Sequence, residues 1–235
     1  MIDKRRVMVV AAAAVCAAGL VPAPPASAAP AQVLRLEFNE PAGARVAADS
    51  SGAGRNGAVG SHLVFNNSVA TFDRHDPGAN AAFKNEHLIV VPDAADKSLD
   101  PGTGNFSVEI RFRTKEKFGN VIQKGQATDP GGQVKFQIPK GRLSCMFRSP
   151  SGTATANSGD KLLNDNVFHT VRCDRTPTSV TMYVDGVRVG RKNGTTGNID
   201  NTKPWSIGGK SSCDGTKVTC DYFAGQIDYV RLTKG

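Results

Sequence analysis

The amino-acid sequence of 235 residues has few aromatic side chains and few long apolar runs. It contains one Trp, three Tyr and four His, and its charged residues are scattered along the chain. A nucleic-acid surface needs a basic helix or a stripe of basic and aromatic residues, and the sequence has neither. The formal net charge of +8 therefore predicts a mildly basic, solvated surface, and no nucleic-acid partner is expected.

Motifs of several enzyme classes are missing as well. The sequence has no G-x-S-x-G, no H-E-x-x-H and no phosphate-binding loop, which argues against the hydrolases, metalloproteases and nucleotide enzymes that depend on them. No C-x-x-C pair accompanies the five cysteines, so a zinc site built on cysteine is not expected. The four histidines are isolated in the sequence and predict no common site.

One uncharged run stands at the start of the chain. It extends from Val7 to Leu20, follows the basic residues Lys4 to Arg6, and is followed by Ala26-Ser27-Ala28. This order is typical of a secretory signal peptide with an A-x-A cleavage site, and the run is too short to span a bilayer. We therefore predict a signal peptide over residues 1–28, which includes Cys16, and no membrane insertion.

The remaining chain has the size of one large domain. Without residues 1–28 it keeps about 207 residues, with 26 basic and 20 acidic side chains, which suits a single all-β domain. We predict a flexible tail over residues 29–31 and one domain over residues 32–235. The predicted signal peptide indicates a secreted, extracellular protein, and its alanine-rich composition favours a bacterial source.

An exported protein usually oxidises an even number of cysteines, and four remain in the predicted mature chain: Cys145, Cys173, Cys213 and Cys220. Three pairings are possible. Cys145 shares its strand face with Phe147, and Cys173 shares its face with Val171. Because two inward-facing cysteines on separate strands can meet in the core, we expect the disulfides Cys145–Cys173 and Cys213–Cys220.

Alternation of apolar and polar residues, which is typical of β-strands, recurs along the chain, whereas helical periodicity is nearly absent. The most regular case is FSVEIRFR at residues 106–113. The stretch SVTMYVDGVRVG at residues 179–190 alternates on both sides of Asp185-Gly186, which predicts a hairpin with a tight turn. Shorter segments of the same kind cover residues 33–38, 62–65, 68–72, 87–91, 121–123, 134–138, 142–148, 168–175, 205–207 and 226–232.

Many short strands without covering helices predict an all-β fold, either a two-sheet antiparallel β-sandwich or a barrel. We favour the sandwich, of the jelly-roll type. Both ends of the predicted domain are strand-like, so the first and last strands are expected to lie side by side.

Five segments carry a resemblance to a known family: Phe106–Thr114, Phe168–Cys173, Val180–Val187, Ile207–Gly209 and Phe223–Leu232. In this order and spacing they resemble laminin-G-like domains, which belong to the concanavalin A-like lectin/glucanase superfamily. The resemblance covers about residues 32–233. It implies two curved sheets, often a calcium ion, and usually binding of a glycan or a protein.

Enzymes share this fold, so a polysaccharide hydrolase or lyase is the main alternative. Laminarinase-type relatives carry E-x-D-x-x-E, which places two carboxylates for retaining hydrolysis, and this sequence lacks that motif. Glu109 shares its face with Arg111 and Arg113, which predicts an exposed ion-pairing residue. Alginate-lyase relatives need a histidine where this chain has Pro139, so that match fails.

Calcium is the predicted cofactor, in a structural role. Hard oxygen donors crowd the loop that begins at Asp49, and if the terminal strands are adjacent, Asp228 can approach that loop as a second ligand. The alternative is that Asp49 caps its own turn. Both interpretations remain open at this point.

Two aromatic residues are candidates for stacking on a sugar ring: Trp205 and Tyr183. The alternative for Trp205 is a place in the strand core. His169 lies in phase with Val171 and is expected to be a packed imidazole. We predict a non-catalytic binding module with no catalytic residue, which recognises a carbohydrate or an extracellular protein; a structural or protein-adhesion module is a further alternative.

Overall fold

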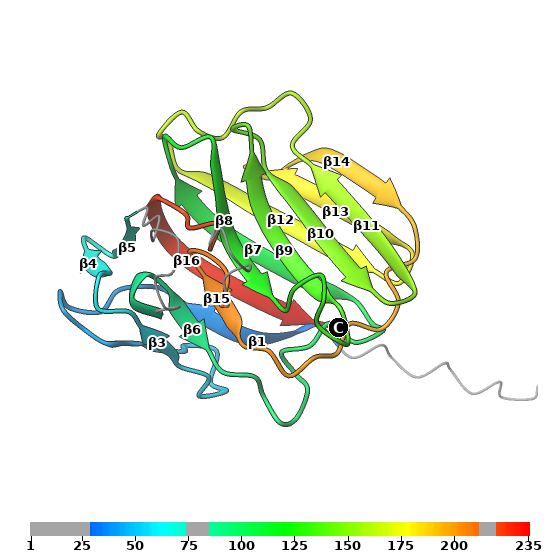
Figure 1. The fold of residues 1–235 in the computed structure, drawn as a ribbon, viewed down its shortest axis with the longest axis horizontal. Coiled ribbons are helices and arrows are strands. Elements are labelled where there is room, and N and C mark those ends of the chain that lie inside the picture. Colours follow the sequence, from blue (N-terminus) through cyan, green and yellow to red (C-terminus); the bar gives the residue numbers. More distant parts are fainter. Residues whose placement is uncertain (1–28, 74–84, 212–219) are drawn as a thin grey trace, which may run out of the picture.

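The computed structural model describes residues 29–73, 85–211 and 220–235, which form two antiparallel β-sheets packed face to face (Figure 1). Each sheet has eight strands among these residues. The predicted all-β sandwich is therefore confirmed. The predicted signal peptide, residues 1–28, lies outside the described residues, and so does Cys16.

Sheet A has the strand order β14-β13-β12-β7-β16-β5-β4, with β1 also paired to β16. Its strands are β1 (Ala31–Leu36), β4 (Val64–Asn66), β5 (Val69–Phe72), β7 (Phe106–Arg113), β12 (His169–Thr176), β13 (Ser179–Val184), β14 (Val187–Asn193) and β16 (Gly225–Lys234).

Sheet B has the strand order β11-β10-β9-β8-β15-β6-β3-β2. A short 3-10 helix, η1 (Asn85–His87), precedes β6. The strands are β2 (Val46–Ala47), β3 (Gly57–Val59), β6 (Ile89–Val91), β8 (Phe118–Lys124), β9 (Gln133–Pro139), β10 (Ser144–Ser149), β11 (Gly152–Asn157) and β15 (Trp205–Ile207).

Strand β7 lies in the middle of sheet A and shows why alternation is a good predictor here. Phe106, Val108, Ile110 and Phe112 are buried, whereas the residues between them are half-buried on the opposite face. Its neighbours β12 and β16 pair with it along its whole length, so its apolar face can pack only into the space between the sheets.

The predicted hairpin is formed by β13 and β14. Asp185 and Gly186 both have positive φ, at 51° and 81°, as a two-residue turn between twisted strands requires. Val180, Met182 and Val184 point into the core, while Val187 on the returning edge strand is 66% exposed. The hairpin therefore buries one of its two strands and leaves the other at the rim of the sheet.

One predicted disulfide joins the two sheets. Cys145 in β10 of sheet B is bonded to Cys173 in β12 of sheet A, and both are fully buried. The prediction from strand phase is confirmed for this pair. Cys220 is also buried, and Cys213 lies outside the described residues.

The first and last strands lie side by side, as predicted, and appear as the blue and red ribbons of Figure 1. Leu34 of β1 is opposite Leu232 of β16, and Ala31 is opposite Lys234. Strand β1 thus begins at Ala31, one residue before the predicted start of the domain.

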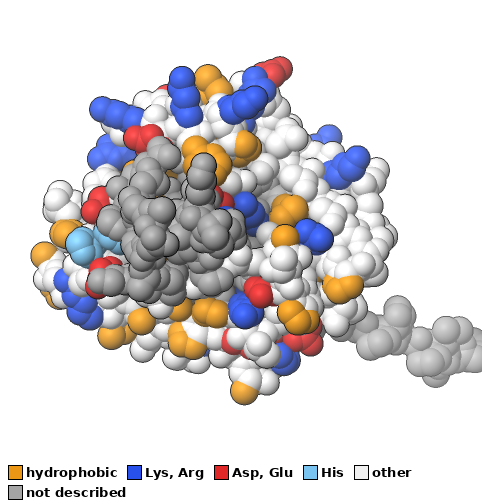
Figure 2. Space-filling model, viewed as in Figure 1, with side chains coloured by type: hydrophobic (Ala, Val, Ile, Leu, Met, Phe, Trp, Pro, Cys, Tyr) orange, Lys and Arg blue, Asp and Glu red, His pale blue; other side chains and the backbone are white. Residues whose placement is uncertain are grey.

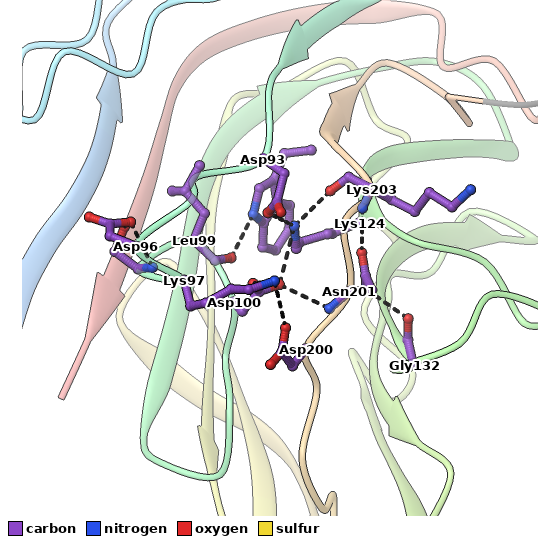
Figure 3. Close-up of polar contacts among 12 residues, drawn as sticks. Asp93, Asp96, Lys97, Leu99, Asp100, Lys124, Gly132, Asp200, Asn201 and Lys203 are labelled. Atoms are coloured by element: carbon purple, nitrogen blue, oxygen red, sulfur yellow. Dashed lines mark hydrogen bonds and ion pairs between the residues drawn. The ribbon is translucent and has the colours of Figure 1, made fainter.

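A buried network of charged side chains holds the loop after β6 against sheet B (Figure 3). Lys124 is 0% exposed, and its Nζ lies 2.6 Å from Asp93 Oδ1 and 3.2 Å from Asp100 Oδ1. Burial raises the pKa of the Asp100 carboxyl above its ordinary value, although Lys124 opposes this. Lys124 Nζ also donates to the carbonyl oxygen of Lys203, so one ammonium group ties three segments together.

Candidate ligand-binding site

Trp205 belongs to the core and not to a sugar-binding surface. Its side chain is 0% exposed, its Nε1 donates to the carbonyl oxygen of Leu99 at 2.9 Å, and its ring stacks on Phe106. A ligand cannot reach an indole in this position, so the prediction of Trp205 as a sugar platform is wrong. The alternative, a strand-core residue, is what the structure shows.

Tyr183 lies on the outer face of β13, as the alternation indicates, and is half-buried. The guanidinium of Arg172 stands 4.5 Å above the centre of its ring. Stacking on a ligand would require this cation to move aside, and the role of Tyr183 in binding stays a prediction.

Asp49 and Asp228 engage different partners. Asp49 Oδ1 accepts from the backbone N–H groups of Arg35 and Ser51, and its Oδ2 accepts from the N–H of Arg55. Burial alone would raise the pKa of Asp49, but these backbone donors hold it below its ordinary value. Asp228 pairs with the guanidinium of Arg111.

This arrangement gives Asp49 the role of a loop cap, which was the alternative to calcium binding. Among the described residues, the group of His, Cys, Asp and Glu side chains close enough to share a metal ion is His62, Asp73 and His87, without Asp49 or Asp228. Calcium binding by Asp49 and Asp228 therefore stays a prediction that the geometry does not favour.

A groove of about 520 Å³ crosses the outer face of sheet A and contains Glu109. The Oε1 of Glu109 accepts from Tyr229 at 3.1 Å and from Arg231 at 3.3 Å. In the same groove Asp174 pairs with Arg172 at 3.1 Å. Glu109 is thus an ion-pairing residue, as predicted, but it is partly buried and its cation comes from β16 instead of from β7.

His169 is packed, as predicted, and is held between two aspartates. Its Nδ1 lies 2.8 Å from Asp185 Oδ2, and its Nε2 lies 3.2 Å from Asp165 Oδ1. Asp185 also accepts from the backbone N–H of Thr170 and from Lys161. Burial alone would raise the pKa of Asp185, but His169, Lys161 and Thr170 together lower it below 3.8.

Asp185→Asn is expected to weaken the fold near neutral pH and to reduce its sensitivity to acid. The stabilisation from a carboxyl with a lowered pKa is fully present above 3.8 and is lost as the pH falls through the folded-state value. Because Asp185 is partly exposed, the loss at pH 7 should be about 1 kcal/mol or less. Thermal unfolding between about pH 7 and pH 3 measures it, since asparagine also tolerates the positive φ at this turn.

Asp160→Asn is the matched control, because the side chain of Asp160 is fully exposed and forms one ion pair with Arg142. The two variants make the same change in charge. An acid dependence of Asp185→Asn that is the same as in the unmodified chain would contradict the role given to this carboxylate.

A second groove, of about 210 Å³, lies on the outer face of sheet B. Its side chains come from three neighbouring strands and from the segment after β15. Gln123 of β8 is opposite Lys135 of β9, and Lys135 is opposite Met146 of β10. Its lining includes Gln123, Gln133, Lys135, Met146, Arg148 and Lys210.

Two of the three cations in this sheet B groove have an acidic partner. Lys210 Nζ lies 2.9 Å from Asp221 Oδ2, and Lys135 Nζ lies 3.6 Å from the same oxygen. Arg148 is exposed and has no carboxylate within ion-pair distance among the residues that the structure describes. None of the described lining residues is acidic, and Arg148 is the lining cation that carries its charge at the exposed end.

The sheet B groove is lined by the buried amides Gln123 and Gln133, and Asn120 lies beside Gln123. Asn120 Nδ2 donates to Gln123 Oε1 at 2.8 Å, and Gln123 Nε2 donates to the carbonyl oxygen of Gly125 at 2.7 Å. Asn120 Oδ1 and Gln133 Oε1 are buried and accept no hydrogen bond from the described part of the chain. An unpaired buried acceptor costs about 1–3 kcal/mol, so a hydroxyl donor from outside the chain would be stabilised at Gln133 once its side chain turns toward the groove.

The model of the concanavalin A-like lectin/glucanases superfamily, in its laminin-G form, matches residues 85–235. The chain belongs to this superfamily. The laminin-G-like resemblance of the sequence is thereby confirmed. Among the described residues, no helix has the length and apolar composition to cross a membrane.

Relatives of this superfamily member are distant. Neurexin-1a-beta of Danio rerio is 25% identical over 103 residues, which are 44% of this chain and 23% of the neurexin. The binding domain of Paraclostridial Mosquitocidal Protein 1 has a TM-score of 0.59 at 15% identity, covering 86% of this chain and 47% of the other. The binding domain of botulinum neurotoxin DC, solved in complex with rat synaptotagmin II, has a TM-score of 0.61 at 11% identity, covering 86% and 48%.

At these identities the two toxin domains show the fold alone. The chain spans less than half the length of each of these three relatives. What this member of the superfamily binds therefore depends on its own side chains.

Sequence reasoning missed the sheet B groove of this laminin-G-like domain. Alternation at residues 134–138 and 142–148 already places Lys135 and Met146 on outward faces. The pairing of β8, β9 and β10, which makes these side chains neighbours, is a long-range property that no local pattern contains.

Proposed function

We propose that the protein is a non-catalytic binding module that holds an acidic polysaccharide in the groove on the outer face of sheet B. The observation that carries this proposal is the combination of three cationic side chains with a buried amide oxygen that lacks a donor. Arg148 attracts carboxylate or sulfate groups, Lys135 and Lys210 add positive charge beside Asp221, and Gln133 Oε1 suits a sugar hydroxyl.

The composition of the groove also indicates how the ligand is held. None of the described lining residues is aromatic, so a sugar ring would not stack on a π-system there. Met146 supplies apolar contact, and the remaining contacts are hydrogen bonds and ion pairs. A binding site of this kind should weaken with added salt, because the ion pairs at its exposed end are screened.

The absence of catalysis is supported by the surroundings of Glu109. Its carboxylate is engaged by Arg231 and Tyr229 on sheet A, on the other side of the sandwich from the cationic groove. A retaining hydrolase needs two carboxylates about 5–5.5 Å apart flanking its substrate. The described lining of the sheet B groove contains no carboxylate to serve as either partner.

Arg148→Glu is expected to lower the affinity for an acidic polysaccharide at least about tenfold, because it replaces an attraction by a repulsion at the exposed end of the groove. Binding is measured by affinity electrophoresis and pull-down on alginate, polygalacturonate, heparin and neutral dextran. The acidic polymers should be retained and dextran should not.

Arg188→Glu is the matched control, since Arg188 is also exposed but lies on β14 of sheet A. It changes the net charge by the same amount and should alter the affinity less than about twofold. Equal losses in both variants would show attraction by the overall charge and would overturn the sheet B site.

The same polysaccharide panel distinguishes the proposed function from the two alternatives. Release of reducing sugar or unsaturated uronate from the panel, lost in Glu109→Gln, would establish the hydrolase or lyase instead. Retention on a protein partner without retention on any polysaccharide would establish the adhesion module. The proposed setting is extracellular, which the leader-like residues 1–28 and the disulfide Cys145–Cys173 support.

A further inference from the structure

Two histidines and one aspartate that are isolated in the sequence lie together at one edge of the sandwich. His62 precedes β4, Asp73 follows β5, and His87 ends η1, one residue before β6. One potential ligand atom from each residue lies within 4.8 Å of the others. Strand pairing therefore brings together histidines that are far apart in the chain, and the expectation that they share no site stays a prediction.

The backbone around this cluster is held by hydrogen bonds. The N–H of His62 donates to the carbonyl oxygen of Glu86 at 2.9 Å, and the N–H of Gly60 donates to the carbonyl oxygen of Leu88 at 2.9 Å. A Cβ atom at Gly60 would lie 2.3 Å from the carbonyl oxygens of Asn85 and Glu86. Glycine at this position therefore permits the close approach that sets His62 beside His87.

One side chain of the cluster is buried and two are exposed. His87 is 4% exposed, and its Nδ1 lies 3.0 Å from Asp73 Oδ1. The rings of His62 and His87 are 4.3 Å apart between centres. The side chains of His62 and Asp73 are 52% and 59% exposed, so both can rotate toward an ion and the ion has a path from solvent. Figure 2 shows histidine at the edge of the molecular face.

We propose that His62, Asp73 and His87 bind one Zn²⁺ ion. Two imidazole nitrogens and one carboxylate oxygen form a ligand set typical of zinc, which holds such donors at about 2.0–2.2 Å. Calcium prefers oxygen donors only, so the histidines select against it. Three protein ligands leave a fourth position open to Glu86, whose Oε2 lies 3.8 Å from His62 Nε2, or to a group of a bound partner.

Zinc at this place would also join the two sheets. His62 and Asp73 flank the hairpin β4–β5 of sheet A, and His87 leads into β6 of sheet B. An ion that binds the folded chain and not the unfolded chain stabilises the fold by mass action, so the melting temperature should rise with zinc concentration.

The test is a calorimetric titration of the oxidised full chain with ZnCl₂ after treatment with EDTA. We expect one ion per chain. His62→Ala and Asp73→Asn should each lower the affinity at least about tenfold. Replacement of zinc by Co²⁺ should give the visible absorption of a four-coordinate ion, and His62→Ala should abolish it.

Both test residues are exposed, so these variants should fold, and thermal unfolding without metal checks this. Asp96→Asn is the matched control, because the side chain of Asp96 is 62% exposed and lies outside the cluster; its affinity should equal that of the unmodified chain. Absence of zinc binding in the unmodified chain, or unchanged binding in His62→Ala and Asp73→Asn, would overturn the proposal.

Discussion

Lys124→Met is expected to lower the free energy of unfolding by about 3–5 kcal/mol, because it leaves the buried carboxylate of Asp100 with only the partly exposed Lys97, 3.9 Å away, as a cation. Asp100 is 1% exposed and lies 3.2 Å from Lys124 Nζ. Methionine fills a similar volume, so the loss reports on charge and hydrogen bonding more than on packing. Urea denaturation followed by the fluorescence of Trp205, the only Trp in the chain, measures it.

The same substitution at Lys203 is the control. The side chain of Lys203 is 47% exposed, and its ammonium group makes an ion pair with Asp129 at 3.5 Å. Such a surface pair contributes about 0–1 kcal/mol, and the carbonyl oxygen that Lys124 uses is retained. The double variant Lys124→Met/Asp100→Asn should recover part of the lost stability, since it also removes the buried negative charge of Asp100. Equal effects of the two single substitutions would contradict the role given to the network.

Replacement of both Cys145 and Cys173 by Ala is expected to lower the free energy of unfolding by about 3.5 kcal/mol in the chain-entropy model. The bond closes a loop with a sequence separation of 28 residues and links the two sheets through the core. For a domain of this size the melting temperature should fall by roughly 10 °C. Thermal unfolding under oxidising conditions measures the change.

Peptide mapping by mass spectrometry under non-reducing conditions tests the pairing itself. It should recover one linked peptide pair that contains Cys145 and Cys173. An unchanged melting temperature in the double variant, or free thiols at these two positions in the purified oxidised protein, would contradict the disulfide and weaken the extracellular setting proposed for the chain.

The alternation of apolar and polar residues predicts this fold well wherever one face of a strand is apolar and the other is polar. Strand β7 and the hairpin around Asp185 satisfy that condition, and the phase of Cys145 and Cys173 predicts which cysteines face the core. Strand β11 was missed because its inward residues are the small Ala154 and Ala156, which give only a weak alternation.

The sites were predicted less well, because they depend on contacts between distant segments. Tryptophan is a residue type that often stacks on sugar rings. Only the hydrogen bond of Trp205 to Leu99 and its complete burial assign it to the core. His62 and His87 are separated by a hairpin and by a segment outside the described residues, so their proximity follows from tertiary structure alone. Residue type indicates what a side chain can bind, whereas sheet register decides which side chains act together.

The pairing of β1 with β16 has a consequence for how such a domain combines with other chains. Ala31 and Lys234 are opposite each other on neighbouring strands, so the polypeptide enters and leaves the sandwich at one place. A unit with this geometry fits into a surface loop of a host protein through two short linkers. A circular permutant that joins these ends and opens the exposed turn at Ala42 and Gly43 would keep every strand pairing intact.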